Sequence, residues 1–286
     1  MEIIRSIPLM KAKASGWKAS GMSIGFVPTM GYLHEGHMSL IREAARENDV
    51  VVVSVFVNPI QFGANEDFGR YPQDMARDSD LCARAGVDAV FNPSASDMYP
   101  TDFCGYVDMS VVTEGLCGAK RPGHFRGVAT VVMKFFHIIN PDRAYFGQKD
   151  AQQLAVIRRM TRDFNMDVAI IGLPIVRDHD GLAMSSRNAY LAVHERAASL
   201  SLHKALQEAL KLYRRGENSA KRIKRLAEEI LSNNPLIKTD YIEIVDAETM
   251  RPLKDIDRPA LCAVAAFVGE TRLIDNILFN VREEGL

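Results

Sequence analysis

The sequence contains few cysteines and no excess of charge of either sign. Its four cysteines are scattered along the chain and form no CxxC pair: they are Cys82, Cys104, Cys117 and Cys262. Free thiols in a reducing cytoplasm are the simplest interpretation of this pattern. The formal net charge of −1 at pH 7 provides no broad basic field for holding nucleic acid. We therefore expect neither a disulfide framework nor a nucleic-acid partner.

Long apolar segments are also missing. No run of about 18 apolar residues occurs, so we expect no transmembrane helix and no membrane partner. The first twenty residues lack an apolar core of signal-peptide length, which favours a cytoplasmic protein. With 286 residues, 47% of them hydrophobic and 25% charged, the chain is long enough to form two globular domains.

The most informative segment that is present spans residues 24–37. Its first apolar residues favour a short buried strand, which Pro28 is expected to end. Apolar residues at helical spacing then predict a helix over 38–47. His34 and His37 would lie at the entrance of this helix, where free backbone N–H groups and the helix dipole favour an anion. Two imidazoles three residues apart can share one face, so the turn suits a phosphate chain.

Two other interpretations of this histidine pair stay open on the motif alone. Histidines near the end of a strand are often structural, and a close pair can also bind a metal ion. A zinc ion would need a further ligand at defined spacing. The sequence has no HExxH motif and no cysteine near the pair, so nucleotide phosphate is the favoured ligand.

The first part of the chain repeats the order strand, turn, helix. Residues 50–57 are almost continuously β-branched, which indicates a strand buried on both faces of a parallel sheet. Parallel strands need helical crossovers, and helices are predicted over 72–85, 128–139 and 151–163. The pattern predicts an α/β fold with a Rossmann-like doubly wound parallel sheet, whose strands cover residues 24–27, 50–57, 87–91, 143–146 and 168–171. A further short strand is possible at 106–109.

The pattern changes after residue 175. Helices are predicted over 193–216 and 219–232, and strands follow at 238–245, 260–268 and 271–279. The last two strands suggest a hairpin that turns near Glu270. We therefore expect a Rossmann-like nucleotide-binding domain over residues 1–175 and a smaller C-terminal α+β domain over residues 176–286.

Polar residues follow several of the predicted strands. Asn58 and Gln61 come after the strand at 50–57, at the carboxyl edge where open α/β sheets bind ligands. They are site candidates, although satisfying the backbone of the turn is an equally good explanation. Lys149 lies at a helix start, where the dipole disfavours a cation, so a bound anion explains it better. Gln153 lies one turn into that helix and would face the same site.

Two more segments are candidates for phosphate binding. Residues 184–187 offer two hydroxyls and a guanidinium, which bind phosphate oxygens well, although serines that cap the next helix are an alternative. Residues 120–127 are rich in cations and glycine, and could form either a phosphate-contacting loop or an exposed basic turn. His137 lies in a predicted apolar helix, where packing is a better explanation than ligand binding.

Taken together, these segments resemble one enzyme family. The segments PTMGYLHEGH, FVNPIQF, RPGHFRGV, PDRAYFGQKDAQQL and MSSRN occur in the order found in the pantoate–beta-alanine ligases, also called pantothenate synthetases. This family belongs to the nucleotidyltransferases that share HIGH and KMSKS signatures with class I aminoacyl-tRNA synthetases. The resemblance extends over essentially the whole chain.

The resemblance implies an ATP-dependent ligase of pantothenate biosynthesis. It would join (R)-pantoate to beta-alanine through a pantoyl-adenylate intermediate and release AMP and pyrophosphate. Mg²⁺ would accompany ATP, held mostly by phosphate oxygens and water rather than by a protein site. The resemblance also implies a homodimer, and a second domain that closes over the active site.

The resemblance further implies roles for individual residues. His37 would be the catalytic donor, assisted by His34 and Lys149, and the pantoate and beta-alanine site would use Gln61, Gln153 and, less strongly, Asn58. ATP would contact Met30, Gly31, Tyr32, Leu33, His34, Glu35, Gly36, His37, Gly147, Gln148, Lys149, Asp150, Val176, Met184, Ser185, Ser186 and Arg187.

Three other functions are weighed against this one. A nucleotidyltransferase that stops after transferring AMP would need the histidine pair but no amine acceptor. A non-catalytic nucleotide sensor would bind ATP without producing AMP. A tRNA-charging enzyme is disfavoured because no basic module follows residue 190.

Overall fold

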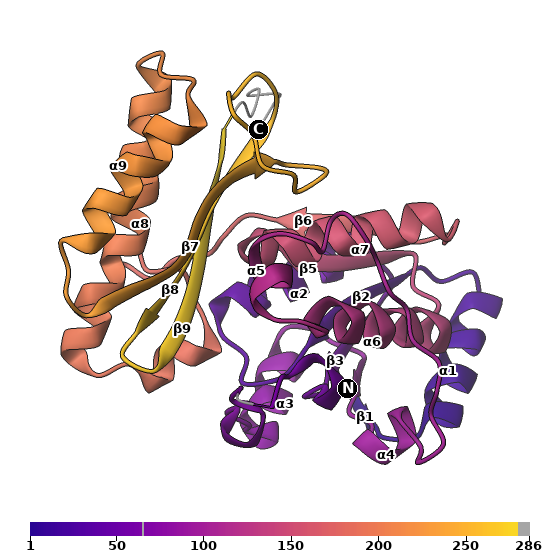
Figure 1. Cartoon of the computed structure of the whole chain (residues 1–286). Coiled ribbons are helices and arrows are strands. Elements are labelled where there is room, and N and C mark those ends of the chain that lie inside the picture. The colour runs from indigo at the N-terminus through magenta and orange to yellow at the C-terminus, as the bar shows by residue number, and fades with distance from the viewer. Residues whose placement is uncertain (65, 280–286) are drawn as a thin grey trace. The chain divides into compact units, whose positions relative to one another are not determined.

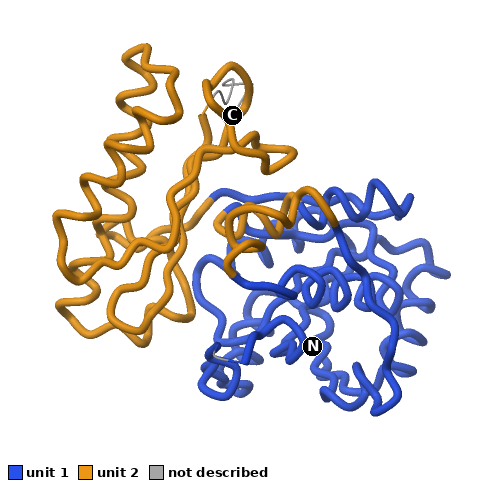
Figure 2. Tube along the Cα trace, viewed as in Figure 1, with its two compact units in different colours: residues 1–109, 121–148, 156–174 blue, residues 110–120, 149–155, 175–286 orange. Residues whose placement is uncertain are grey.

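The structure, a computed structural model, describes residues 1–64 and 66–279. The chain forms two compact units (Figure 2). Unit 1 consists of residues 1–109, 121–148 and 156–174, and unit 2 of residues 110–120, 149–155 and 175 onward. The sequence places residues 1–175 in one domain. The structure instead assigns two short segments of that range, 110–120 and 149–155, to unit 2.

Unit 1 contains the predicted doubly wound parallel sheet (Figure 1). Its six strands are parallel and lie in the order β1-β4-β3-β2-β5-β6. The strands are β1 (Glu2–Ile4), β2 (Ile24–Thr29), β3 (Val50–Val55), β4 (Ala89–Phe91), β5 (Arg143–Gly147) and β6 (Ala169–Leu173). The helices are α1 (Ile7–Ala19), α2 (Glu35–Glu47), α3 (Met75–Arg84), α4 (Ala95–Met98), α6 (His124–Ile139) and α7 (Ala151–Asp163), whose first turn belongs to unit 2.

The strand order reverses between β2 and β5. The chain runs from β2 to β3 and β4 on one side, and then returns to β5 and β6 on the other. β2 pairs with β3 along its whole length but with β5 only at Gly25 and Phe26. Open α/β sheets bind ligands at the carboxyl ends of the strands on either side of such a reversal. The fold therefore directs attention to the turns after β2, β3 and β5.

The sequence predicts that Pro28 ends the first strand. In the structure, β2 instead continues to Thr29. Pro28 lies beyond the last residue of β2 that pairs with β5. A proline has no N–H to donate to a neighbouring strand. At position 28 no N–H is needed on the side of β5, because the pairing with β5 has already ended. The proline thus marks where β2 and β5 separate rather than where the strand stops.

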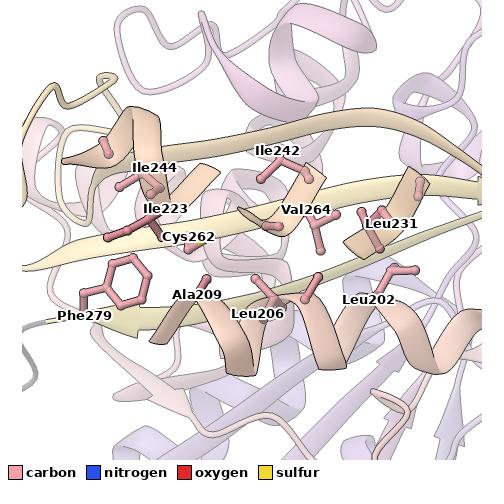
Figure 3. Packing of buried hydrophobic residues seen from close by; sticks show 14 of the residues in the cluster. Leu202, Leu206, Ala209, Ile223, Leu231, Ile242, Ile244, Cys262, Val264 and Phe279 are labelled. Carbon is pink, nitrogen blue, oxygen red and sulfur yellow. The ribbon is translucent and has the colours of Figure 1, made fainter. Parts of the chain in front are cut away.

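Unit 2 contains a three-stranded antiparallel sheet in the order β7-β8-β9. The strands are β7 (Ile237–Asp246), β8 (Ala260–Val268) and β9 (Thr271–Phe279), and the helices are α5 (Leu116–Lys120), α8 (Val193–Arg214) and α9 (Ala220–Ser232). α8 and α9 pack against the sheet through apolar side chains (Figure 3), among them Leu202, Leu206, Ile223, Leu231, Ile242, Val264 and Phe279. The predicted α+β domain with its β8–β9 hairpin is confirmed.

Several local predictions need correction. Residues 106–109 form no strand. α6 begins at His124, four residues before the prediction, and His137 within it is exposed rather than packed.

The four cysteines are free thiols, as expected. Among the described residues, no helix combines the length and apolarity needed to cross a membrane.

Candidate active site

The turn between β2 and α2 is held by a buried carboxylate. Gly31 has a φ of +89° and Tyr32 a φ of 52°. A Cβ on Gly31 would lie 3.0 Å from a methyl group of Val55, so the glycine is needed both for its backbone conformation and for space. The Asp78 carboxylate in α3 accepts the backbone N–H of Tyr32 at 2.7 Å and that of Leu33 at 2.8 Å. The shape of the turn therefore depends on a residue from a later helix.

Asp78 supports this turn, and its role is not among those expected from the sequence. It is only 1% exposed. Burial raises the pKa of its carboxyl group, and the two backbone N–H donors and the nearby Arg77 oppose this effect. A signal was present in the sequence, because Asp78 and Cys82 share the buried face of α3. A carboxylate is rarely buried unless it has partners.

His34 and His37 cap α2 reciprocally. His34 is the N-cap residue, and its Nδ1 accepts the N–H of Gly36 at 3.1 Å, while His37 Nδ1 lies 3.3 Å from the His34 backbone nitrogen and accepts its N–H. The two rings lie with their centroids 4.1 Å apart. A backbone N–H can only donate, so a neutral imidazole in either position carries its hydrogen on Nε2. With both rings in this tautomer, the two Nε2–H groups lie at the positive end of the helix.

The predicted segment from Met30 to His37 covers this turn and the first three residues of α2. Glu35 is exposed and forms an ion pair with Arg42. Met30 links the turn to the next one along the sheet, because Gln61 Nε2 donates to its sulfur at 3.1 Å. The turns that follow β2 and β3 are therefore in contact.

Asn58 uses both ends of its amide within the protein. Its Nδ2 donates to Gln61 Oε1 at 3.0 Å and to the Gly127 carbonyl at 3.1 Å, and its Oδ1 accepts the Tyr99 hydroxyl at 2.7 Å. Asn58 is 1% exposed and Gln61 is 9% exposed. These bonds fix the side chain of Gln61 and make Asn58 its support, a role that the sequence does not indicate.

α6 approaches the Gln61 segment, the short 3-10 helix η1 (Pro59–Gln61), very closely. A Cβ on Gly127 would lie 2.4 Å from the Ile60 carbonyl oxygen, so only glycine allows this contact. His124 Nδ1 lies 2.9 Å from the Gln61 carbonyl oxygen. Residues 59–61 are therefore held from two sides.

Arg121 belongs to the same network. Its guanidinium binds both carboxylate oxygens of Glu66 and lies 3.0 Å from His124 Nε2. The guanidinium also lowers the pKa of Glu66 against the opposing effect of burial, which is the larger single influence. The side chain of Arg121 is 17% exposed, so it is neither a mobile phosphate-binding cation nor an exposed basic residue.

In unit 2, Lys149 lies in the 3-10 helix η3 (Gln148–Asp150). Removal of its ammonium group from water lowers the pKa of Lys149, and the charge of Arg187 lowers it further, whereas Asp150 and Asp275 act in the opposite direction. Two predicted phosphate-binding cations from separate segments are thus close enough to repel each other. An anion placed at both would relieve this repulsion.

The second cation lies just after a small hairpin. Backbone bonds join Asp178 N–H to the Leu182 carbonyl at 2.8 Å and Met184 N–H to the Val176 carbonyl at 3.0 Å. Ser185 then accepts the Arg187 N–H at 3.3 Å and caps the 3-10 helix η4 (Ser186–Tyr190). Ser185 thus caps a short 3-10 helix rather than α8, whose N-cap is Ala192. Its hydroxyl hydrogen can still be donated.

The remaining predicted residues divide between the units. Gly147 and Gln148 belong to unit 1 with the histidine pair, Asn58 and Gln61. Asp150, Gln153, Val176 and the 184–187 segment belong to unit 2 with Lys149. Gln153 is half-buried in the first turn of α7, and Asp150 is exposed. Within residues 1–64 and 66–279, no group of three or more His, Cys, Asp or Glu side chains could hold a metal ion.

Comparison with known proteins identifies relatives along nearly the full chain. The model of the pantoate-beta-alanine ligase family matches residues 2–278. The pantothenate synthetase of Thermotoga petrophila is 56% identical over 280 residues, which cover 98% of this chain and 100% of the relative. That of Clostridium botulinum (strain Kyoto / Type A2) is 52% identical over 281 residues, with the same two coverages.

Solved structures agree with this relationship. The pantothenate synthetase of Thermus thermophilus superposes with a TM-score of 0.91 at 45% identity, covering 97% of this chain and 99% of that one. The pantoate-beta-alanine ligase of Francisella tularensis, complexed with beta-gamma ATP and beta-alanine, has a TM-score of 0.81 at 33% identity, and 97% of each chain is covered. The chain therefore belongs to the pantoate-beta-alanine ligase family, and the ligase activity implied by its sequence motifs is confirmed.

Proposed function

We propose that this chain condenses (R)-pantoate with beta-alanine in two steps and uses ATP. A pantoate carboxylate oxygen attacks the α-phosphorus of ATP, the bond to the β-phosphate oxygen breaks, and pyrophosphate leaves. The beta-alanine amine then attacks the acyl carbon of pantoyl adenylate, loses a proton, and releases AMP. Adenylation is needed because a free carboxylate would have to expel oxide, whereas AMP is a good leaving group. Family membership and the ATP and beta-alanine complex of the Francisella relative support this proposal.

The reciprocal capping of His34 and His37 is the observation that carries the proposal. Negative charge moves onto the phosphate oxygens as the α-phosphorus is attacked, so fixed donors at that position lower the barrier. Because each Nδ1 is engaged by a backbone N–H, the rings cannot turn without breaking the cap. We assign His37 as the catalytic donor and His34 as its partner on the phosphates.

Lys149 and Arg187 are assigned to the triphosphate. Burial lowers the pKa of Lys149, and the charge of Arg187 lowers it further. A bound polyanion would oppose this effect by favouring the charged form of the lysine. Ser185, Ser186 and Met184 would contribute the remaining contacts of this segment. Backbone groups of Gly147 and Val176, with Gln148 and Asp150, are assigned to the rest of the nucleotide.

Pantoate is assigned to Gln61 and Gln153, because a side-chain amide offers both a donor and an acceptor to an alcohol. Asn58 would act through Gln61, whose Oε1 it holds at 3.0 Å. Mg²⁺ would neutralise the triphosphate and be held by its oxygens and water. Asp78 would not be a ligand, since its two oxygens already accept backbone N–H groups.

Two rate measurements test the function. Pantoate-dependent exchange of labelled pyrophosphate into ATP should occur without beta-alanine, which shows reversible adenylation. Addition of beta-alanine should then give pantothenate and AMP in equal amounts. Exchange without amide formation would indicate a nucleotidyltransferase of a different kind, and ATP binding without pyrophosphate release would indicate a nucleotide sensor.

We also propose that the protein works as a homodimer in the reducing cytoplasm. The four free thiols are compatible with that compartment. Light scattering coupled to gel filtration, with and without reductant, should give twice the chain mass of 31.8 kDa in both conditions. A monomer, or a dimer lost on reduction, would contradict this assignment.

A further inference from the structure

Two adjacent polar residues are buried in the middle of β9. Asp275 and Asn276 are each 4% exposed, and the roles proposed above use neither of them. They pair with Val264 and Ala263 of β8, so they are part of a regular ladder. Burial of a carboxylate and an amide is unfavourable unless partners compensate for it, and those partners indicate what the two residues do.

Asn276 holds the backbone of Lys149. Its Nδ2 donates to the Lys149 carbonyl oxygen at 2.9 Å. The lysine side chain is long and flexible, so the position of its ammonium group depends on where its backbone is fixed. Asn276 provides that fixed point from a strand 127 residues further along the chain.

Asp275 holds the hairpin that precedes Ser185. Its two oxygens accept two N–H groups from Arg177, at 2.7 Å and 2.9 Å. Arg177 also donates to the Gly181 carbonyl at 3.1 Å, so the ion pair closes the hairpin internally and ties it to β9. Such bidentate pairs define orientation as well as distance.

One strand can hold both segments because neighbouring side chains of a strand point to opposite faces. Asp275 shares the face of Leu273 and Phe279, which packs on α8 and α9, and His203 of α8 lies 3.9 Å from its carboxylate. Asn276 points to the other face, toward Lys149. The two anchored segments are those to which the proposed function assigns the triphosphate.

Building on that proposed function, we infer that Asp275 and Asn276 are positioning residues for the ATP phosphates. Asn276 acts through Lys149, and Asp275 acts through Arg177 on the segment from Met184 to Arg187. Neither residue needs to touch ATP. A misplacement of about 1 Å at a reacting group can lower a rate by about 100-fold, so loss of either anchor should affect catalysis.

A double-mutant cycle between Asn276→Ala and Lys149→Met tests the inference. In the wild-type background, Asn276→Ala should lower kcat/KM for ATP in pyrophosphate exchange roughly 10-fold or more, with less than a roughly twofold change in KM for pantoate. In the Lys149→Met background the same substitution should have less than a roughly twofold effect, because the group it positions is gone. A general loss of structure would act equally in both backgrounds, and that result would overturn the inference.

The same logic applies to Asp275→Asn with Arg177→Gln. The double variant should lose no more activity than the worse of the two single variants, whereas additive losses would contradict a joint role. Ser199→Ala is a matched control, since Ser199 is a fully buried polar residue of unit 2 whose hydroxyl donates to the Glu195 carbonyl within α8. Its kinetics should match those of the wild type.

Calorimetric titration with Mg-ATP separates this inference from the proposed function. A wild-type chain that binds ATP but shows no pantoate-dependent exchange would refute the proposed function alone. The positioning role would then be judged on affinity, where Asn276→Ala should bind ATP at least roughly 10-fold more weakly. Unchanged affinity in that variant, or no ATP binding by the wild type, would overturn the inference.

Discussion

The residues assigned to ATP in unit 1 differ in kind from those assigned to it in unit 2. In unit 1 the proposed donors are the imidazoles of His34 and His37, at the N-terminus of α2. In unit 2 the donors are the cations Lys149 and Arg187, which come from separate segments. The first arrangement is local and organised by a helix terminus, whereas the second depends on ion pairs and on β9.

This difference has a physical consequence. Neutral imidazoles at a helix N-terminus need no compensating charge, because the positive partial charge there belongs to the helix itself. Side-chain cations repel one another and lose solvation when they are held together, so they need fixed anions and anchors nearby. In unit 2 the anchors are Asp275 and Asn276. In unit 1 the only buried anion at the turn, among the described residues, is Asp78, and it accepts the backbone N–H groups of the turn.

His37→Ala should cause the largest loss. Removal of a donor aimed at developing charge costs about 2–4 kcal/mol of transition-state stabilisation, which is roughly 30- to 900-fold in the rate of pyrophosphate exchange. Circular dichroism should show an intact fold. The exposed His137 of α6 offers a matched control, and His137→Ala should exchange at the wild-type rate. Exchange by His37→Ala at that same rate would remove His37 from the catalytic assignment.

Lys149→Met should reveal the charge-based character of unit 2. Loss of a charge-assisted bond costs about 1.5–3 kcal/mol, or roughly 10- to 150-fold in kcat/KM for ATP. Added salt screens charges, so wild-type kcat/KM for ATP should fall with ionic strength, and the slope should be smaller in Lys149→Met but unchanged in His37→Ala. Equal slopes in all three proteins would show that the salt dependence of kcat/KM for ATP does not come from Lys149, which would contradict the distinction drawn between the two units. Lys204→Met, at an exposed lysine of α8, is the control.

Asp78→Asn should show how far the unit 1 turn depends on one carboxylate. An amide has one oxygen to accept an N–H, so one of the two donors from Tyr32 and Leu33 would face an NH₂ group instead. An unsatisfied buried donor costs about 1–3 kcal/mol, which should appear as a lower free energy of unfolding and a higher KM for ATP. Asp80→Asn on the same helix changes an exposed carboxylate and should have neither effect. If Asp78→Asn were as stable as the wild type, the turn would keep its conformation without both hydrogen bonds to Asp78.

The two units also differ in what their sequence reveals. The strand, the turn and His34 and His37 are consecutive in the chain, so hydrophobic pattern and helix-start chemistry predict them together. The sequence shows Lys149 as a cation at a helix start. It does not show that Asn276 anchors the lysine backbone, because Asn276 lies 127 residues away and reaches Lys149 only through the pairing of β9 in the sheet. The partners of Asp78 and Asn58 are likewise not visible in the sequence, since they come from other elements. For Asp78, helical spacing indicates burial but not what the carboxylate binds. Local pattern predicts donors, and long-range packing determines which residues support them.

Gln61→Ala should affect pantoate more than ATP. A single neutral hydrogen bond contributes about 0.5–1.5 kcal/mol, so KM for pantoate should rise roughly 2- to 12-fold while KM for ATP stays within a roughly twofold range. Steady-state kinetics with each substrate varied in turn measures both constants. An increase confined to ATP would show that the residues are wrongly divided between the two substrates. Gln73→Ala, at an exposed glutamine of unit 1, should change neither constant.

The smallest expected effect concerns the pH dependence of stability in unit 2. Burial, reinforced by the charge of Arg177 and opposed by Asp275, lowers the pKa of His203 from its ordinary value of 6.5. At a pH near or below the ordinary pKa, the folded state then binds fewer protons than the unfolded state. Acidification from the ordinary pKa toward the lowered one must therefore reduce the free energy of unfolding, whereas His203 causes no such loss at higher pH.

Between about pH 7 and about pH 5, the free energy of unfolding should therefore fall further in the wild type than in His203→Gln, which cannot titrate. Urea denaturation at several pH values measures the difference, and the exposed His194 supplies the control variant His194→Gln, which should follow the wild type. Parallel curves for wild type and His203→Gln would show that the cations and anions around Asp275 balance without the neutral imidazole. The free energy of unfolding would then not depend on His203 being neutral, although His203 lies beside the Arg177–Asp275 ion pair.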